Sequence, residues 1–174
     1  LTDLAFVTHV DKNYLIGLES KTIMKSPLIA VMHPTHALAN RDSLSIKDLS
    51  GFPMINFSPQ ANPITSDFNK QIFKKAGAQL NIVREIPNIE TAAFCASINE
   101  GVFIMPEYLR SSIGSLRTIP LTDSFAYVTL NLIWKKKNPN ICTVLERLSA
   151  KNGRSKTLRS DFQKYRKTSD AVLP

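Results

Sequence analysis

The sequence predicts a mixed α/β fold with two lobes, and three observations carry this prediction. Residues 4–7, 28–32 and 102–105 are apolar runs without alternation, which are typical of strands buried on both faces. Segments with helical periodicity separate these runs, as in α/β proteins. Residues 26–59 contain a strand, a polar crossing, a short capped helix and a second strand. We expect the chain to leave one lobe through this segment and to begin another.

Composition is that of an ordinary globular protein, with 43% apolar and 21% charged residues in a chain of 174. No apolar run approaches the roughly 20 residues of a membrane span. The chain starts at Leu1 without a signal-peptide pattern, so we expect a fragment of a longer protein. Cys95 and Cys142 lie in apolar helical patterns, where free thiols pack as small hydrophobes. Two buried thiols suit a reducing, cytoplasmic location.

The net charge of +8 is unevenly distributed along the chain. Residues 151–174 hold seven basic and two acidic side chains, or +5, which leaves +3 for residues 1–150. A basic tail of this kind could contact nucleic acid or an acidic partner. The commoner alternative is a tail that is simply solvated, and both alternatives stay open.

The first predicted strand, residues 4–7, ends at Thr8. Ligands of α/β sheets lie beyond the carboxyl ends of strands, so the Thr8 hydroxyl is a candidate ligand contact. The alternative is that Thr8 stabilises a local turn. Residues 10–25 show no clear pattern. The next strand, residues 28–32, stops at the His33-Pro34 pair, because proline cannot donate to a β-ladder.

Ser45 is a predicted N-cap of a short helix, which residues 54–57 follow as a buried strand. A polar loop then leads to a helix over residues 68–76, for which we expect Thr65 or Ser66 as N-cap and Gly77 as the C-terminal stop. Such a loop could bind a carboxylate at the positive end of the helix dipole. The alternative is that its side chains only cap the helix. The candidate ligand contacts of this loop are Ser58, Gln60, Asn62, Thr65 and Ser66.

Residues 81–86 alternate as a strand, and Asn88 is the predicted cap of a helix that Gly101 closes. After the buried strand at residues 102–105, Pro106 is the expected first residue of another short helix. Three further elements are expected: a linker at residues 119–121, a strand over 127–134, and a final helix from 138 with an apolar stripe up to Leu148.

Three motifs together resemble one protein family. The segment PLIAVMHPTHALANRDSLSIKDLSGFPMI, residues 27–55, resembles the crossover segment of the effector-binding domain of LysR-type transcriptional regulators. His36-Ala37-Leu38-Ala39 stands where that family usually has His-Pro-Leu-Ala. Residues 3–7, DLAFV, resemble the family's "lDlai" strand, and residues 101–106, GVFIMP, resemble its "GiallP" strand. The similarity covers about residues 1–150.

The resemblance implies a periplasmic-binding-protein-like (type 2) domain with two crossover strands. Its first lobe would comprise residues 1–34 plus 123–150 and its second residues 35–122, followed by a basic tail at 151–174. The first lobe would be incomplete, because the family's domain begins with a further strand and helix. The resemblance also implies a small-molecule effector in the inter-lobe cleft, a homo-oligomer, and DNA binding through a winged helix-turn-helix outside this chain.

Two other classes of function compare with this one. A solute-binding protein of a transport system shares the two-lobe architecture and is the alternative. An enzyme is not expected, because the sequence has no nucleophile elbow, phosphate loop, zinc-binding helix or Cys-x-x-Cys motif. Its three histidines show no metal-ligand spacing, so we expect no metal or cofactor. The effector class that suits the loop is a small organic acid or another polar metabolite.

Overall fold

The structure, a computed structural model, describes residues 4–8, 15–136 and 144. It divides into two compact units, residues 1–21 with 131–174 and residues 22–130. Strands β2 (Leu18–Met32) and β7 (Tyr127–Lys135) contribute residues to both units. Apart from Val144, the predicted final helix and the basic tail lie outside the described residues.

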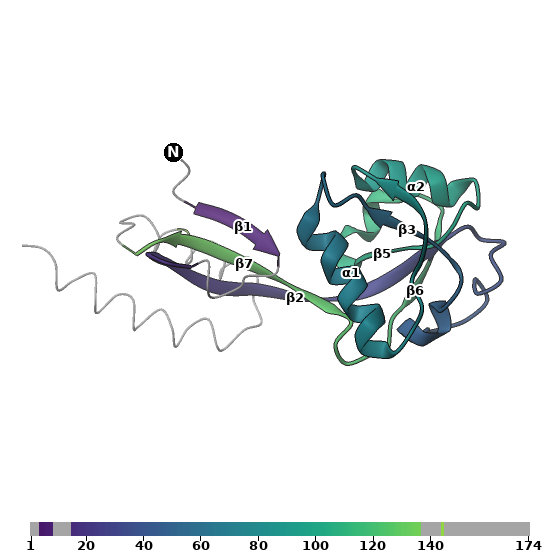
Figure 1. Cartoon of the computed structure of the whole chain (residues 1–174). Coiled ribbons are helices and arrows are strands. Elements are labelled where there is room, and N and C mark those ends of the chain that lie inside the picture. The colour runs from purple at the N-terminus through teal and green to yellow at the C-terminus, as the bar shows by residue number, and fades with distance from the viewer. Residues whose placement is uncertain (1–3, 9–14, 137–143, 145–174) are drawn as a thin grey trace, which may run out of the picture. The chain divides into compact units, whose positions relative to one another are not determined.

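The first unit is built on a sheet in which β1 (Leu4–Thr8) pairs with β7, and β7 with β2 (Figure 1). Trp134 is buried here, and its Nε1 donates a hydrogen bond to Glu19 Oε2 at 2.9 Å. β2 begins at Leu18, well before the predicted strand at residues 28–32. Residues 18–25 show no clear sequence pattern because the first half of β2 is only partly buried and carries polar side chains.

The second unit holds two groups of paired strands, and a parallel bridge between Met54 and Val102 joins them. β3 (Pro53–Phe57) pairs in parallel with β4 (Asn81–Ile86). β5 (Phe103–Pro106) and β6 (Arg117–Pro120) both run antiparallel to β2. The predicted linker at residues 119–121 is therefore wrong, since Ile119 is a fully buried β6 residue that faces Ala30 of β2.

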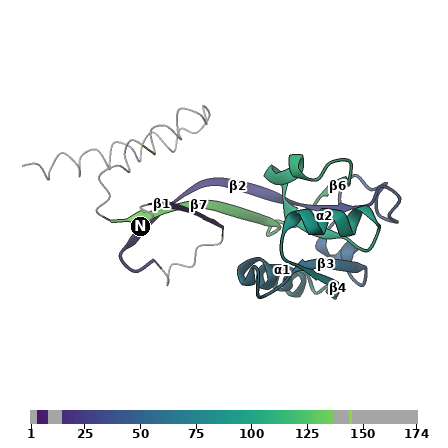
Figure 2. The same ribbon diagram turned by 90° about the horizontal axis from the view of Figure 1, so that it is seen from above.

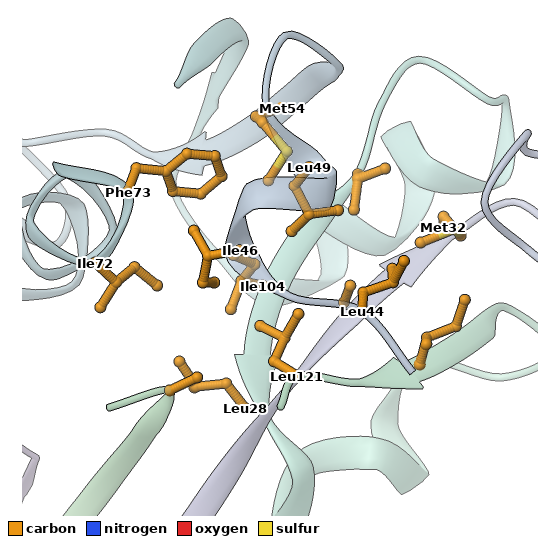
Figure 3. Close-up of a cluster of buried hydrophobic side chains, with 14 of the residues drawn as sticks. Leu28, Met32, Leu44, Ile46, Leu49, Met54, Ile72, Phe73, Ile104 and Leu121 are labelled. Carbon is orange, nitrogen blue, oxygen red and sulfur yellow. The ribbon is translucent and has the colours of Figure 1, made fainter. Parts of the chain in front are cut away.

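Helices pack on both faces of β2 in the second unit, and Figure 2 shows α1 beside β3. Successive residues of β2 belong to two hydrophobic clusters, because strand side chains alternate between faces. Leu28 and its alternate neighbours pack with α1 (Pro63–Ala76) and the 3-10 helix η2 (Ile46–Leu49), as Figure 3 shows. Ile29 and Val31 pack with α2 (Ile89–Ser97). The prediction of a strand buried on both faces is confirmed.

Three of the predicted helix ends are confirmed. Ser45 and Asp48 form a capping box at η2, in which the Ser45 N–H donates to Asp48 Oδ2 at 2.7 Å. Asn88 caps α2 by accepting the Thr91 N–H at 2.9 Å. Gly77 ends α1 with a left-handed φ of 64°, a conformation that glycine adopts without strain.

Gly101 does not close α2, contrary to the prediction. The helix ends at Ser97, and Asn99 takes the left-handed conformation instead. Gly101 lies where the chain returns to the sheet, and a Cβ there would be 2.7 Å from the Pro53 carbonyl oxygen. This close approach lets the Val102 N–H donate to Pro53 O at 2.9 Å. The glycine is needed for space rather than for its dihedral freedom.

Pro106 is the last residue of β5 and the N-cap of the 3-10 helix η3 (Glu107–Ser112), rather than the first helical residue that the sequence predicted. Within the described ranges, no helix has the length and apolar content to span a membrane.

Candidate functional site

The candidate site lies at the edge of the sheet where β3 and β4 end. Because the two strands are parallel, the residues that follow them lie at the same edge. The Ser58 N–H after β3 donates to the carbonyl oxygen of Ile86, the last residue of β4, at 2.9 Å. Each strand leads into a helix, so the N-termini of α1 and α2 both start from this edge.

The loop between β3 and α1 is held by its own hydrogen bonds. The carbonyl oxygen of Ser58 accepts the N–H groups of Ala61, at 3.2 Å, and Asn62, at 2.9 Å. The Ser58 hydroxyl oxygen also accepts the Ala61 N–H, at 3.1 Å. Pro59 and Pro63 further restrict the backbone at the two ends of the loop. Internal hydrogen bonds and prolines therefore define the conformation of the loop.

The N-cap of α1 is Asn62, so the predicted caps, Thr65 and Ser66, are wrong. The Asn62 side-chain oxygen accepts the Thr65 N–H and its carbonyl oxygen accepts the Ser66 N–H, both at 3.0 Å. Pro63 has no N–H, so Ile64 holds the one first-turn N–H without a protein acceptor among the described residues. The sequence signal for this start is Asn followed by Pro, a favoured cap and a favoured first residue.

The predicted ligand contacts of the loop differ in whether their side chains already have hydrogen-bond partners. Within the part of the chain that the structure describes, the hydroxyl of half-buried Thr65 and the amide of exposed Gln60 have no hydrogen-bond partner. The Ser58 hydroxyl accepts one N–H and keeps its own proton for donation. The Asn62 side chain is occupied by the cap. Ser66 is fully buried, and its hydroxyl oxygen accepts a hydrogen bond from Asn56 Nδ2 at 3.4 Å.

Ser66 belongs to a buried polar cluster that the sequence analysis missed. Asn56 of β3 and Asn69 of α1 expose 2% and 6% of their surface, and Asn69 Nδ2 donates to Asn56 Oδ1 at 2.8 Å. Polar side chains at these positions interrupt the buried stripe of each element. That interruption was visible in the sequence, because Asn56 lies inside the otherwise apolar run Met54–Phe57.

Thr8, the sixth candidate, lies at the carboxyl end of β1 and is half-buried. It belongs to the first unit, whereas the five loop residues belong to the second. The structure thus brings the loop candidates together around one helix start and places Thr8 in a different compact unit.

The site carries no positive side chain of its own. Residues 53–69 contain no Lys, Arg or His, and Asp67, their one charged residue, pairs with Lys70 at 3.9 Å. Hydroxyl, amide and backbone N–H groups are therefore the donors that this segment itself offers. Among the described residues, no three His, Cys, Asp or Glu side chains lie close enough to hold a metal ion.

Among the described residues, the titratable groups with shifted pKa values all lie outside residues 53–69 of the sequence. Hydrogen bonding by Arg84 lowers the pKa of Glu100, and these two residues form an ion pair beside α2. Burial raises the pKa of the nearby Cys95 thiol, and its hydrogen bond with Glu100 acts in the same direction. A buried thiol with a raised pKa is a poor nucleophile. This group therefore has the properties of a structural cluster.

Comparison with known proteins identifies the family. Residues 2–148 match the sequence model of the LysR substrate binding domain. The chain belongs to this family. Among curated proteins, it is 25% identical over 121 residues to the uncharacterized HTH-type transcriptional regulator YnfL of Escherichia coli (strain K12). It is 29% identical over 119 residues to the uncharacterized HTH-type transcriptional regulator YwbI of Bacillus subtilis (strain 168).

These matches cover 69% and 67% of this chain but only 41% and 39% of YnfL and YwbI. The chain thus spans about two fifths of the length of these LysR-type relatives. Among solved structures, the effector binding domain of BenM with its effector benzoate superimposes with a TM-score of 0.75 at 18% identity. That match covers 88% of this chain and 72% of the BenM chain, and it shows the periplasmic-binding-protein-like (type 2) fold of LysR effector-binding domains.

Proposed function

We propose that this LysR substrate-binding domain senses a small polar metabolite, which it binds through the loop at residues 58–65. The observation that carries the proposal is the set of unused donors on an ordered loop. The Thr65 hydroxyl, the Gln60 amide and the Ile64 N–H lie within six residues of one another and have no partner among the described residues. The Ser58 hydroxyl adds a fourth donor.

Donors of this kind suit a carboxylate or a hydroxyl group. The positive end of the α1 dipole favours negative charge, while the absence of Lys and Arg from residues 53–69 disfavours a multiply charged anion. Ile64 is 54% exposed and offers an apolar surface next to the donors. A small organic acid with one carboxylate and an apolar body fits this combination. Benzoate, the effector of BenM, has this chemistry.

The family supports a role for the domain in a transcriptional regulator. In this proposal the effector favours one arrangement of the domain and so changes a homo-oligomer that presents DNA-binding segments from outside these 174 residues. The relatives YnfL and YwbI are named as HTH-type regulators and are longer than this chain, which supports that division of roles. A cytoplasmic location follows from the same proposal, and no catalytic step is part of it.

Calorimetric titration with benzoate and a panel of small organic acids tests the proposal. A bound effector also stabilises the protein, by about 2.7 kcal/mol at a hundredfold excess over Kd. Thr65→Ala should weaken binding about tenfold, the worth of one lost hydrogen bond of about 1.4 kcal/mol. Thr65→Ser should bind normally. Thr8→Ala tests whether Thr8, the sixth predicted ligand contact, contributes to binding.

The matched control is Thr91→Ala, because Thr91 occupies the same position after the cap of α2 as Thr65 does after the cap of α1. It should leave affinity unchanged. Equal losses for Thr65→Ala and Thr91→Ala would contradict a site at the α1 loop, and so would binding that is indifferent to both Thr65→Ala and Gln60→Ala.

A further inference from the structure

We propose that Asn56, Ser66 and Asn69 are positioning residues, which hold the first turn of α1 and the loop before it in the geometry that the effector meets. The effector part of this inference rests on the proposed function. None of the three side chains is exposed enough to meet a ligand directly. They act through the backbone of the loop residues.

A continuous path of hydrogen bonds joins the three side chains to the loop. Asn69 donates to Asn56, and Asn56 donates to the Ser66 hydroxyl. The Ser66 N–H then donates to the Asn62 carbonyl oxygen at 3.0 Å, and the Asn62 N–H donates to that of Ser58 at 2.9 Å. Every step from the middle of α1 to the residue that follows β3 is therefore a directional contact.

Burial makes this arrangement costly, which argues that it has a role beyond packing. The three residues expose 2%, 0% and 6% of their surface, and buried polar groups lose their hydration. The net gain from their hydrogen bonds is no larger than that from well-packed apolar side chains of similar shape. Apolar contacts, however, are non-directional. Hydrogen bonds instead specify where α1 stands along β3.

The buried face of α1 shows which part of the helix these hydrogen bonds position. Its first buried residues, Ser66 and Asn69, are polar, whereas the next two, Ile72 and Phe73, are apolar. The polar half is the half that carries the loop donors. The apolar half anchors the helix in the core shown in Figure 3. Directional hydrogen bonds thus fix the N-terminal half of α1, and apolar packing fixes its C-terminal half.

Hydrogen exchange of the loop amides, followed by NMR on the full chain, tests the positioning role without any effector. The double variant Asn56→Leu/Asn69→Leu removes both buried partners and keeps similar side-chain shapes. We expect its melting temperature to stay near that of the wild type, while the amides of Thr65 and Ser66 exchange at least tenfold faster. Wild-type protection of these amides in a stable double variant would overturn the proposal.

Two further variants keep the test decisive. Ser66→Ala removes one hydroxyl and needs no repacking, so it serves if the double variant does not fold, and it should speed exchange at the same amides. Ile72→Val lowers stability in the same helix without touching the cluster, and it should leave the relative protection of Thr65 and Ser66 unchanged. Selectively faster exchange at these two amides in Ile72→Val would also overturn the proposal, because loss of helix stability would then explain the effect.

Titration with benzoate tests whether the positioning role affects effector binding. If the wild type binds it, the stable double variant should bind at least fivefold more weakly, and unchanged affinity would overturn the link to the effector. If the wild type binds neither benzoate nor any organic acid of the panel, the proposed function fails for that chemical class. The exchange experiment then decides the positioning role by itself.

Discussion

The second unit makes the same structural step twice, from β3 to α1 and from β4 to α2, and the two steps differ in their interiors. Both helices start at an asparagine cap, with a threonine as the third helical residue. The first step uses the loop at residues 58–62 and buries Ser66 and Asn69, whereas the second uses only Pro87 and Asn88 and buries Ala92, Cys95 and Ala96. A short connection over an apolar interior suffices for packing. The longer connection from β3 to α1, with its buried polar residues, therefore indicates a role other than stability.

The largest expected difference in unfolding free energy is between a buried phenylalanine of α1 and an exposed phenylalanine of α2. Phe73 is almost fully buried, so Phe73→Ala should reduce the free energy of unfolding by about 3–5 kcal/mol, through lost burial and a residual cavity. Phe94 of α2 is 64% exposed, and Phe94→Ala should change it by less than about 0.5 kcal/mol. Urea unfolding measures both. Similar costs would mean that another surface covers Phe94.

The next largest effect on stability is expected at Gly101, where the chain returns from α2 to the sheet. Gly101→Ala places a Cβ against the Pro53 carbonyl oxygen, a backbone atom that cannot move aside cheaply. We expect a loss of about 1–3 kcal/mol in unfolding free energy, as for other overpacked sites. Asn99→Gly is the control, because its positive φ suits glycine, and it should be neutral or slightly stabilising. A neutral Gly101→Ala would contradict the close approach of residue 101 to β3.

Substitution of the two N-caps compares the starts of α1 and α2 directly. Asn62→Ala and Asn88→Ala each remove an acceptor of a first-turn N–H, and each should cost about 0.5–2 kcal/mol. Only Asn62→Ala should also weaken binding of an effector, because Asn62 holds the loop as well as the helix. Chemical denaturation and titration of the two variants side by side measure the difference. Serine at either position should preserve most of the stability.

The smallest effects are two separate pH dependences. Burial lowers the pKa of His36 below its ordinary value of 6.5, and its Nδ1 accepts the Leu38 N–H at 3.2 Å. The folded protein therefore resists protonation that the unfolded chain accepts, so this contribution is complete above pH 6.5 and decreases as the pH falls below it. His36→Gln should flatten the stability profile in that window.

Glu100 titrates in a lower window. Its hydrogen bond from Arg84 lowers its pKa below 4.5, so the stability that it contributes is complete above that pH and is lost as the pH falls through its folded value. Glu100→Gln should flatten the profile there and leave the window near pH 6 unchanged. Unfolding curves from pH 3 to pH 8 separate the two effects. A single window that responds to both substitutions would contradict these separate assignments.

Much of the fold was predictable from local patterns. The run of residues 28–32, the capping box at Ser45 and the caps at Gly77 and Asn88 are each specified by residues close in sequence. The errors depend on long-range contacts. Residues 119–121 resembled a linker because only pairing with β2 makes Ile119 and Pro120 part of a strand.

Gly101 and Asn56 show the same limit for the candidate site. Gly101 resembled a helix stop, because its need for space comes from Pro53, which is distant in sequence. The loop at residues 58–66 was predictable as a polar helix start, and its candidate ligand contacts remain a prediction. Which hydroxyl is occupied was not predictable, because the partner of Ser66 is the side chain of Asn56 on β3, a contact between two different elements.

Trp134 gives the molecule a built-in optical label. It is the single tryptophan of the sequence, it is buried in the first unit, and Glu19 holds its indole N–H. Fluorescence excited at tryptophan wavelengths thus originates in that unit alone. The second unit, residues 22–130, contains tyrosine but no tryptophan. One unfolding experiment, recorded by tryptophan emission and by far-ultraviolet circular dichroism, can therefore report whether the two units melt together or in turn.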